Sequence, residues 1–278
     1  MPVHKNPAQV LRLLDRLEDG DSAFVVHVDA NADDAVEREL RRGTRGRGSV
    51  AFLPRRPCYW GGFGIVDVAL RAFDLLLSRG DPFDHALYVT GQDYPLVSSR
   101  LLRAHLDAAG GRSFIGAAPL PVPFWPGGGR DRIGRWHLVS RVALHLPVPW
   151  RRQVPGGLVP YGGGANWALA RAAVEHVDAA VRREPGLVRF FRHVLHPDEL
   201  FFQTLLLSSK LAGSVVDRHL HYVSWAADPG PKILGVEDLD AMLSSGALFA
   251  RKFDTTVDSV VLDRLDERIA EERDVVAR

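Results

Sequence analysis

The amino-acid sequence predicts an α/β protein with a doubly wound, mostly parallel sheet flanked by helices. Short apolar stretches alternate with amphipathic helical stretches through about the first 116 residues. Apolar strands joined by helical crossovers are typical of parallel sheets that are covered on both faces. In such sheets ligands bind beyond the carboxyl ends of the strands, so functional residues are expected at that edge.

The first expected element is a helix near the start of the chain. Val10, Leu11, Leu14 and Leu17 fall at helical spacing. Asn6 precedes them as a plausible N-cap, and Pro7 suits the first turn, where a missing backbone N–H costs little. We therefore expect an amphipathic helix from this segment.

Seven further elements alternate up to residue 117. Each expected strand is a short, mostly apolar run, whereas each helix repeats its apolar side chains every three to four positions. The first two of these helices end at Gly43 and Gly80, and glycine is a common helix terminator. In chain order the elements are strand 22–29, helix 33–43, strand 49–54, helix 66–80, strand 85–91, helix 98–111 and strand 113–117.

The segment from 117 to 165 differs in composition, because it is dense in proline, glycine, tryptophan and arginine. Loops of that length within a compact domain are usually functional or disordered, and the aromatic residues argue against disorder. Helices return from residue 166, and residues 257–275 are expected to form a closing amphipathic helix. No internal repeat or linker divides the chain.

The overall composition is that of an ordinary globular protein and indicates no special class of partner. The 278 residues are 46% hydrophobic and 25% charged, an ordinary balance for a globular protein, and 35 lysines and arginines face 34 acidic residues. That near-neutrality gives no reason to expect a nucleic-acid or membrane-surface partner. Without a run of about 18 apolar residues or a signal-peptide pattern, we expect a cytoplasmic protein with no membrane span.

Two familiar enzyme classes lack their motifs. The glycine-rich stretches 60–64 and 127–134 do not follow the strand, Gly-x-Gly-x-x-Gly and helix order of the dinucleotide fingerprint, which disfavours an oxidoreductase. No Gly-x-Ser-x-Gly elbow occurs, and Cys58, the only cysteine, has no evident histidine partner. A cysteine metal cluster and an intrachain disulfide are also excluded.

Two segments come nearest to the Asp-x-Asp pattern of a metal site, Asp29 with Asn31 and Asp238 with Asp240. Asp29 has only an asparagine beside it, and Asp238 with Asp240 lies in a helical context typical of a solvated face. His219 and His221 share one face of an expected strand, but no clear third ligand accompanies them, so a structural role is favoured for one or both. We therefore expect no bound metal.

Residues 196–210 open with His-Pro-Asp-Glu and continue into a segment too apolar for the surface. Pro197, Asp198 and Glu199 suit the first turn of a helix, where proline costs little and acids complement the helix dipole. Under a second interpretation, one carboxylate stays ionised there and acts as a general base.

Residues 248–254, Leu-Phe-Ala-Arg-Lys-Phe-Asp, place two adjacent cations between two phenylalanines. Under one interpretation, Arg251 and Lys252 are simply a solvated charge pair. Under the other, these cations beside apolar anchors hold a phosphate-bearing leaving group without a metal.

Taken together, six segments resemble the core-2/I-branching β-1,6-N-acetylglucosaminyltransferase family, glycosyltransferase family 14, which also includes the peptide xylosyltransferases. They occur in the family's order across about residues 23–254. Residues 88–96, YVTGQDYPL, are similar to the family's LSGQDYPL block, and residues 196–206, HPDELFFQTLL, to its SPDExFxxT block. The other four segments are FVVHVDA, YWGGFGIVDVALRAFDLLLS, GGGANWALAR and LFARKFD.

The resemblance implies a single GT-A-type domain over residues 1–278, with a nucleotide-binding half at 1–116, an acceptor and catalytic half at 117–254 and a C-terminal helix at 255–278. It implies inverting, metal-independent transfer of a sugar, N-acetylglucosamine or xylose foremost, from a UDP-sugar donor, with no cofactor. A glycan, a glycolipid or a small molecule is the expected acceptor. Animal members are Golgi proteins with several disulfides, so this chain is expected to belong to a bacterial branch. The alternative is a non-catalytic sugar- or nucleotide-binding module on the same fold.

The resemblance also assigns site residues. Glu199 matches the catalytic base, and Lys252 matches the cation that faces the donor diphosphate. The other donor-side candidates are Arg251, Asp29 and Lys232, and the candidates for sugar or acceptor contact are Asp93, Trp167, Trp125, Trp136 and Trp150. Two interpretations of Asp93 are equally favoured: it contacts the sugar, or it braces its own turn. Tryptophans pack in protein interiors as often as they stack against sugars.

Overall fold

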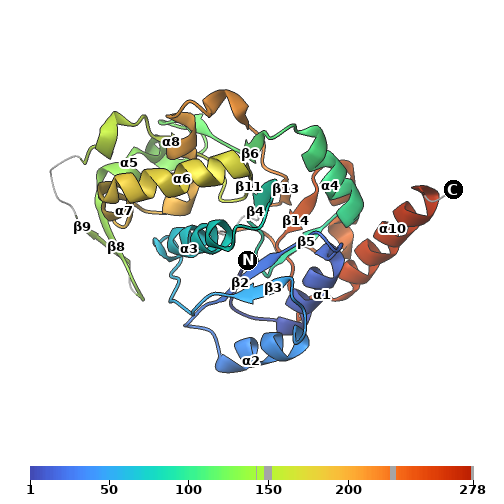
Figure 1. The fold of residues 1–278 in the computed structure, drawn as a ribbon. Coiled ribbons are helices and arrows are strands. Elements are labelled where there is room, and N and C mark those ends of the chain that lie inside the picture. Colours follow the sequence, from blue (N-terminus) through green and yellow to red (C-terminus); the bar gives the residue numbers. More distant parts are fainter. Residues whose placement is uncertain (142, 147–151, 226–229, 277–278) are drawn as a thin grey trace. The chain divides into compact units, whose positions relative to one another are not determined.

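The computed structural model describes residues 1–141, 143–146, 152–225 and 230–276 (Figure 1). They form two compact units that interleave along the chain. Unit 1 comprises Met1–Arg55, Val89–Gly110 and Leu220–Arg278, and unit 2 comprises Arg56–Tyr88 and Gly111–His219. These boundaries differ from the expected halves at 1–116 and 117–254, because residues 56–88 pack with the chain after residue 111. The single-domain organisation stays a prediction.

A three-stranded parallel sheet begins unit 1, in the order β1 (Pro2–Val3), β2 (Phe24–Val28) and β3 (Val50–Phe52). The helices α1 (Pro7–Leu17) and α2 (Asp34–Gly43) connect these strands (Figure 1). This is the predicted alternation of apolar strand and amphipathic crossover. Because the strands are parallel, the residues that follow them come together at one edge of the sheet.

The two helices start differently. Asp33 caps α2 through its side chain, which accepts a hydrogen bond from the backbone N–H of Ala35 at 2.7 Å. Asn6 precedes α1 as predicted, but it adopts a left-handed conformation and makes no capping bond. Its side-chain amide instead donates to Asp254 at 2.6 Å. The predicted capping by Asn6 is therefore wrong, and this side chain links the first helix to the C-terminal part of unit 1.

A second sheet of unit 1 has the order β13 (His221–Val223), β14 (Phe249–Arg251) and β5 (Asp93–Pro95). β13 and β14 are parallel, whereas β5 is antiparallel to β14 and places Asp93 opposite Arg251. The ladder thus brings together two sequence blocks that lie far apart along the chain.

Further helices of unit 1 are α4 (Ser99–Ala108), α9 (Leu239–Ser244) and α10 (Val260–Val276). α10 corresponds to the closing helix predicted at the end of the chain. Asp266 of α10 accepts a hydrogen bond from the Tyr94 hydroxyl at 2.7 Å, which ties this helix to β5.

The main sheet of unit 2 is mixed, in the order β12 (Val215–Val216), β6 (Ser113–Ile115), β11 (Trp167–Ala170) and β4 (His85–Leu87). β12 and β6 are parallel, and β11 is antiparallel to both of its neighbours. Together with the parallel strands of unit 1, this sheet confirms the α/β class. Parallel and antiparallel pairs nevertheless occur side by side in unit 2.

Helices α3 (Gly64–Arg79) and α6 (Arg171–Arg183) of unit 2 lie side by side (Figure 1). α7 (Pro185–Phe191) and α8 (Phe201–Leu207) follow, and α8 also packs on α6. The largest fully buried side chains of this unit are Phe73, Phe191, Phe201, Phe202, Ile115 and Leu169. None of the helices described in either unit combines the length and the apolar character that a membrane crossing requires.

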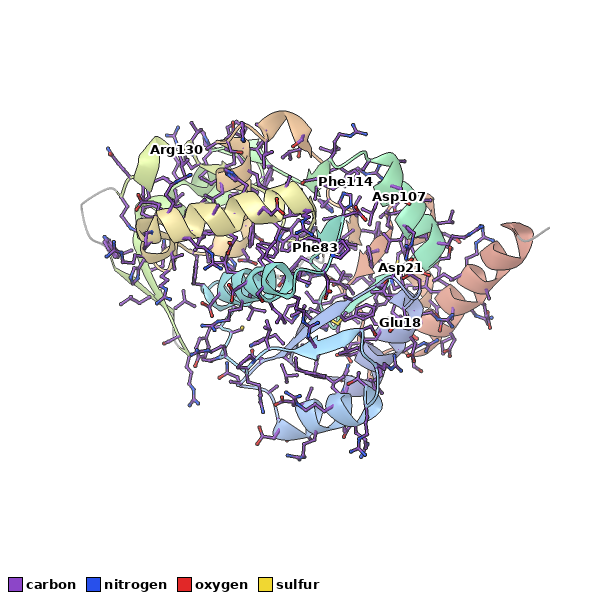
Figure 2. The ribbon with its side chains drawn as sticks, viewed as in Figure 1. Glu18, Asp21, Phe83, Asp107, Phe114 and Arg130 are labelled. Atoms are coloured by element: carbon purple, nitrogen blue, oxygen red, sulfur yellow. The ribbon has the colours of Figure 1, made fainter. Side chains whose placement is uncertain are left out.

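The segment 117–165, expected to be loops, contains short elements instead. β7 (Ala118–Pro119) pairs with β10 (Tyr161–Gly162), and β8 (Trp136–Val139) pairs with β9 (Ala143–Leu146), both antiparallel. A short helix, α5, starts at Arg130, which is exposed, in contrast to Phe114 in the interior of unit 2 (Figure 2).

Candidate active site

Glu199 is the last residue of a short 3-10 turn, η3 (Pro197–Glu199), which directly precedes α8. The sequence pattern predicts that this segment is the first turn of the helix itself. Leu200 instead adopts φ −134° and ψ −34°, so α8 begins only at Phe201. The prediction that Glu199 lies in the first turn of the helix, where the helix dipole would support its charge, is therefore wrong. The prediction of a buried helix directly after this segment is confirmed.

Arg132 forms an ion pair with the Glu199 carboxylate, and the two side chains are 21% and 24% exposed. The Arg132 guanidinium lies over the Trp125 ring, 4.0 Å from its centroid. The indole in turn rests against Gly129 and Gly162, where a Cβ atom would collide with the ring. Two glycines, an indole and a guanidinium thus form a stack that orients the Glu199 carboxylate and stabilises its charge.

His196 immediately precedes this turn and anchors it to a neighbouring loop. Its backbone N–H donates to the carbonyl oxygen of Gly61 at 2.9 Å, and its ring packs edge-on against Trp60 with the ring centroids 4.3 Å apart. Burial, followed by the charge of Arg132, lowers the pKa of His196 to about 4. The imidazole is therefore neutral at pH 7 and adds no positive charge beside Glu199.

In unit 1, Asp29 follows β2 and His4 follows the neighbouring strand β1. The Asp29 carboxylate accepts hydrogen bonds from the backbone and side-chain amides of Asn31 at 2.8 and 3.0 Å. The pKa of the exposed His4 is lowered, first by partial desolvation and then by Lys5 and Lys252, while Asp29 opposes the shift. Asp29 and Lys252 thus both influence the pKa of His4. This histidine lies at the carboxyl end of the parallel strands, where ligands are expected to bind.

Asp93 lies in the interior of unit 1 and is 0% exposed. Its carboxylate accepts from the Thr90 backbone N–H at 2.7 Å and from the Thr90 hydroxyl at 2.9 Å. It also lies 3.3 Å from Nε of Arg251 and 3.5 Å from Nε2 of His221. Burial alone would raise the pKa of Asp93, but Arg251 and His221 outweigh it and lower this pKa. The geometry supports the brace interpretation, and it directs Arg251 towards Asp93.

Lys252 and Lys232 lie on adjoining segments, since the Lys252 N–H points to the Lys232 carbonyl oxygen at 3.4 Å. The Lys232 ammonium contacts Asp238 at 2.8 Å and Glu237 at 3.1 Å, and these contacts raise its pKa. Asp238 is therefore an ion-pair partner rather than part of a solvated face. Within the described residues, the Lys252 ammonium makes no hydrogen bond or ion pair. The charge of Lys252 is available to a ligand, whereas that of Lys232 is already offset.

Trp167 is a core residue of unit 2. It is 5% exposed and packs against three aromatic rings, with centroid distances of 5.5, 5.4 and 5.2 Å to Phe73, Tyr88 and Phe202. The predicted contact between Trp167 and a sugar is therefore corrected to a packing role, because a side chain enclosed in this way offers no face to a substrate.

The other tryptophans differ in their surroundings. The Trp125 ring is covered by Arg132, whereas Trp136 is 37% exposed. Trp136 lies near Arg152, whose guanidinium is 4.4 Å from its ring centroid, and 4.9 Å from the His193 ring. A sugar platform at Trp136 stays a prediction. Trp150 lies outside the described residues.

The candidate residues thus fall into two groups. Glu199 stands with Arg132 in unit 2, and Asp29 and Lys252 share the charge environment of His4 in unit 1. Sequence reasoning misses Arg132, which belongs to no motif, and His4, which follows a strand of only two residues. No group of three histidine, cysteine, aspartate or glutamate side chains able to hold a metal occurs within the described ranges. Metal-independent transfer stays a prediction.

Comparison with known proteins identifies the family. The sequence model of the core-2/I-branching enzyme family matches residues 1–243, so the chain belongs to this family. Human xylosyltransferase 2 is 29% identical to the chain over 287 aligned residues, which cover 93% of the chain and 32% of the human protein. The xylosyltransferase oxt of Drosophila melanogaster is 27% identical over 285 residues, with coverages of 93% and 32%.

The chain spans about a third of the length of these curated relatives. Among solved structures, core-mannan synthase A from Aspergillus fumigatus in its Mn/GDP form aligns with a TM-score of 0.36 and 10% identity. That alignment covers 77% of this chain and 70% of the fungal one. Likeness at this level is remote, and family membership follows from the sequence match.

Proposed function

We propose that this member of the core-2/I-branching enzyme family is an inverting glycosyltransferase that uses a UDP-sugar and needs no metal. Glu199 is the observation that carries the proposal: a partly exposed carboxylate, ion-paired to one guanidinium and fixed at the end of a turn. Xylose is the first donor sugar to test because the similar curated proteins are named xylosyltransferases. N-acetylglucosamine is the second, because the sequence motifs resemble those of N-acetylglucosaminyltransferases.

The chemistry follows from the properties of this carboxylate. A general base must reach the hydroxyl proton that it removes, and its position is therefore fixed by rigid neighbours. Glu199 takes the proton of the acceptor hydroxyl as the hydroxyl oxygen attacks the anomeric carbon. The bond from that carbon to the UDP oxygen breaks, and UDP leaves with the electron pair. A single displacement of this kind inverts the configuration at the anomeric carbon.

Lys252 is the cation we assign to the departing diphosphate. Of the three donor-side cations, Arg251 faces the buried Asp93 and Lys232 is paired with Asp238. A cation without a carboxylate partner stabilises developing phosphate charge more effectively than one already neutralised. Asp29 shares the surroundings of Lys252 and is assigned to the nucleotide. We also propose a cytoplasmic enzyme of a bacterial branch, acting on a glycan, a glycolipid or a small molecule.

Replacing Lys252 with alanine is expected to weaken UDP binding about 10- to 100-fold, because a hydrogen bond to a charged group contributes about 1.5–3 kcal/mol. Calorimetric titration with UDP in low salt measures this effect. Lys210→Ala is the matched control, since Lys210 is an exposed lysine of unit 2 and should leave UDP affinity unchanged. Equal affinity in wild type and Lys252→Ala would remove Lys252 from the donor site.

A further inference from the structure

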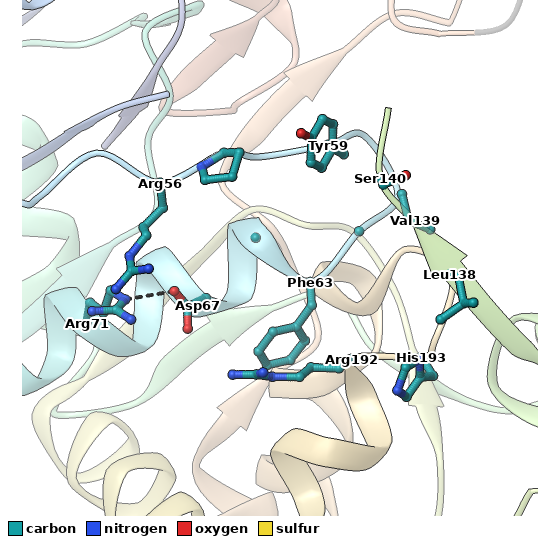
Figure 3. Close-up of a pocket in the computed structure, with 13 residues that line it drawn as sticks. Arg56, Tyr59, Phe63, Asp67, Arg71, Leu138, Val139, Ser140, Arg192 and His193 are labelled. Carbon is teal, nitrogen blue, oxygen red and sulfur yellow. Dashed lines mark hydrogen bonds and ion pairs between the residues drawn. The ribbon is translucent and has the colours of Figure 1, made fainter. Parts of the chain in front are cut away.

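Unit 2 contains an open cavity of about 480 Å³ beside the start of α3 (Figure 3). Its walls come from three stretches of unit 2, residues 56–71, 138–140 and 192–193. A cavity of this size falls within the range of small-molecule sites in proteins. None of the residues assigned above to the donor or to the base lines it.

The lining of the cavity is cationic. Arg56, Arg71 and Arg192 contribute three guanidinium groups, and Asp67 contributes the single carboxylate of the lining. Asp67 pairs with Arg71 on the same helix at 2.7 Å, as Figure 3 shows. The Arg71 and Asp67 side chains are 40% and 28% exposed, and partly solvated pairs four residues apart on a helix contribute about 1 kcal/mol or less, so Arg71 can exchange this partner for a ligand.

Arg192 has no acidic partner among the described residues. Its guanidinium lies on the Phe63 side of the cavity, 5.9 Å from the centroid of that ring (Figure 3). Arginine forms paired hydrogen bonds to phosphate and carboxylate groups, and an aromatic ring beside it holds the planar guanidinium in place. The cavity therefore combines an excess of positive charge with an arginine that can form bidentate hydrogen bonds to an anion.

The cavity is connected to the segment that carries Glu199. Tyr59 and Phe63 of its wall belong to the loop whose Gly61 carbonyl accepts the His196 N–H at 2.9 Å. His196 in turn leads into the turn that ends at Glu199. His193, another lining residue, contacts the exposed Trp136. An acceptor held at this cavity would therefore be bound by the same unit that supplies the base.

We propose that this cavity binds an anionic group of the acceptor, so that the substrate is a carbohydrate carrying a phosphate or a carboxylate. This inference rests on the proposed function. Arg192, with Arg71 and Arg56, holds the anion, and the exposed indole of Trp136 lies next to the cavity, where the apolar face of a sugar can stack.

Binding of two probes, inorganic phosphate and glucuronate, to the full chain tests the proposal. Each is titrated calorimetrically in the presence of saturating UDP, so that the donor site is occupied. At least one probe is expected to bind, and Arg192→Glu should weaken that binding more than tenfold. Arg183→Ala, which removes an exposed arginine of unit 2 outside the cavity, should change it less than twofold. Arg56→Ala is the second cavity variant, and circular dichroism verifies that each variant is folded.

The two probes distinguish the source of the charge. Phosphate binding alone assigns a phosphorylated acceptor, glucuronate binding alone assigns an acidic sugar, and binding of both assigns a site for either. The proposal is overturned if neither probe binds, or if both cavity variants bind like wild type. Anion binding that depends on Arg192 in a chain that fails to bind UDP would leave the cavity assignment standing and refute the proposed function.

Discussion

Glu199→Gln is expected to lower the turnover number about 10²- to 10⁴-fold, the range in which general bases contribute to catalysis. Glutamine has nearly the same size and still accepts hydrogen bonds from Arg132, but its amide takes up no proton. UDP affinity should stay within about twofold, because Glu199 belongs to unit 2 whereas the residues assigned to UDP belong to unit 1. Release of UDP from UDP-N-acetylglucosamine and UDP-xylose measures turnover, and calorimetry measures affinity.

Asp198→Asn supplies the control for this prediction. Asp198 is the adjacent carboxylate of the same turn, and it is the other candidate base that the sequence pattern leaves open. If Glu199 is the base, Asp198→Asn retains most of the turnover. Loss of turnover in Asp198→Asn together with normal turnover in Glu199→Gln would transfer the role to Asp198.

Trp167→Ala is expected to lower the free energy of unfolding by about 3–5 kcal/mol, the usual cost of removing a buried tryptophan. Trp167 packs among Phe73, Tyr88 and Phe202, and the cavity left behind cannot be filled by these rigid rings. Chemical denaturation monitored by circular dichroism measures the change. The Michaelis constants of the protein that remains folded should be close to those of wild type.

Trp60→Ala is the matched control for Trp167→Ala. Trp60 is 83% exposed, so its removal should change the unfolding free energy by only about 0.5 kcal/mol. A Trp167→Ala variant of normal stability but with a raised Michaelis constant for the donor or acceptor would contradict the core assignment. That outcome would restore a substrate contact at Trp167.

The alternation of strands and helices is predictable because each element carries its own periodicity. The apolar run of residues 24–28 predicts β2 by itself. The amphipathic pattern after Asp33 likewise predicts α2, without information from distant parts of the chain. The division into units is not local, since it depends on residues 56–88 packing with the chain after residue 111. The role of Asn6 also depends on a distant residue. Its side chain is of a type that caps helices, but it donates a hydrogen bond to Asp254 instead.

The candidate site shows the same division between local and distant effects. Glu199 and Lys252 lie in recognisable motifs, so the sequence finds them. The partner of Glu199 lies 67 positions earlier in the chain, at Arg132, and no pattern links the two. Asp93 and Arg251 meet only through the antiparallel pairing of β5 and β14, which explains why the sequence leaves two interpretations of Asp93 open.

Calorimetric titration of the wild-type chain with UDP, first in EDTA and then with added manganese, tests the central claim most directly. A UDP-sugar enzyme that relies on Lys252 instead of a metal is predicted to bind UDP with the same affinity under both conditions. Binding that appears only with manganese would contradict the metal-independent mechanism and return attention to Asp29. Absence of binding under both conditions would contradict the use of a UDP-sugar donor altogether.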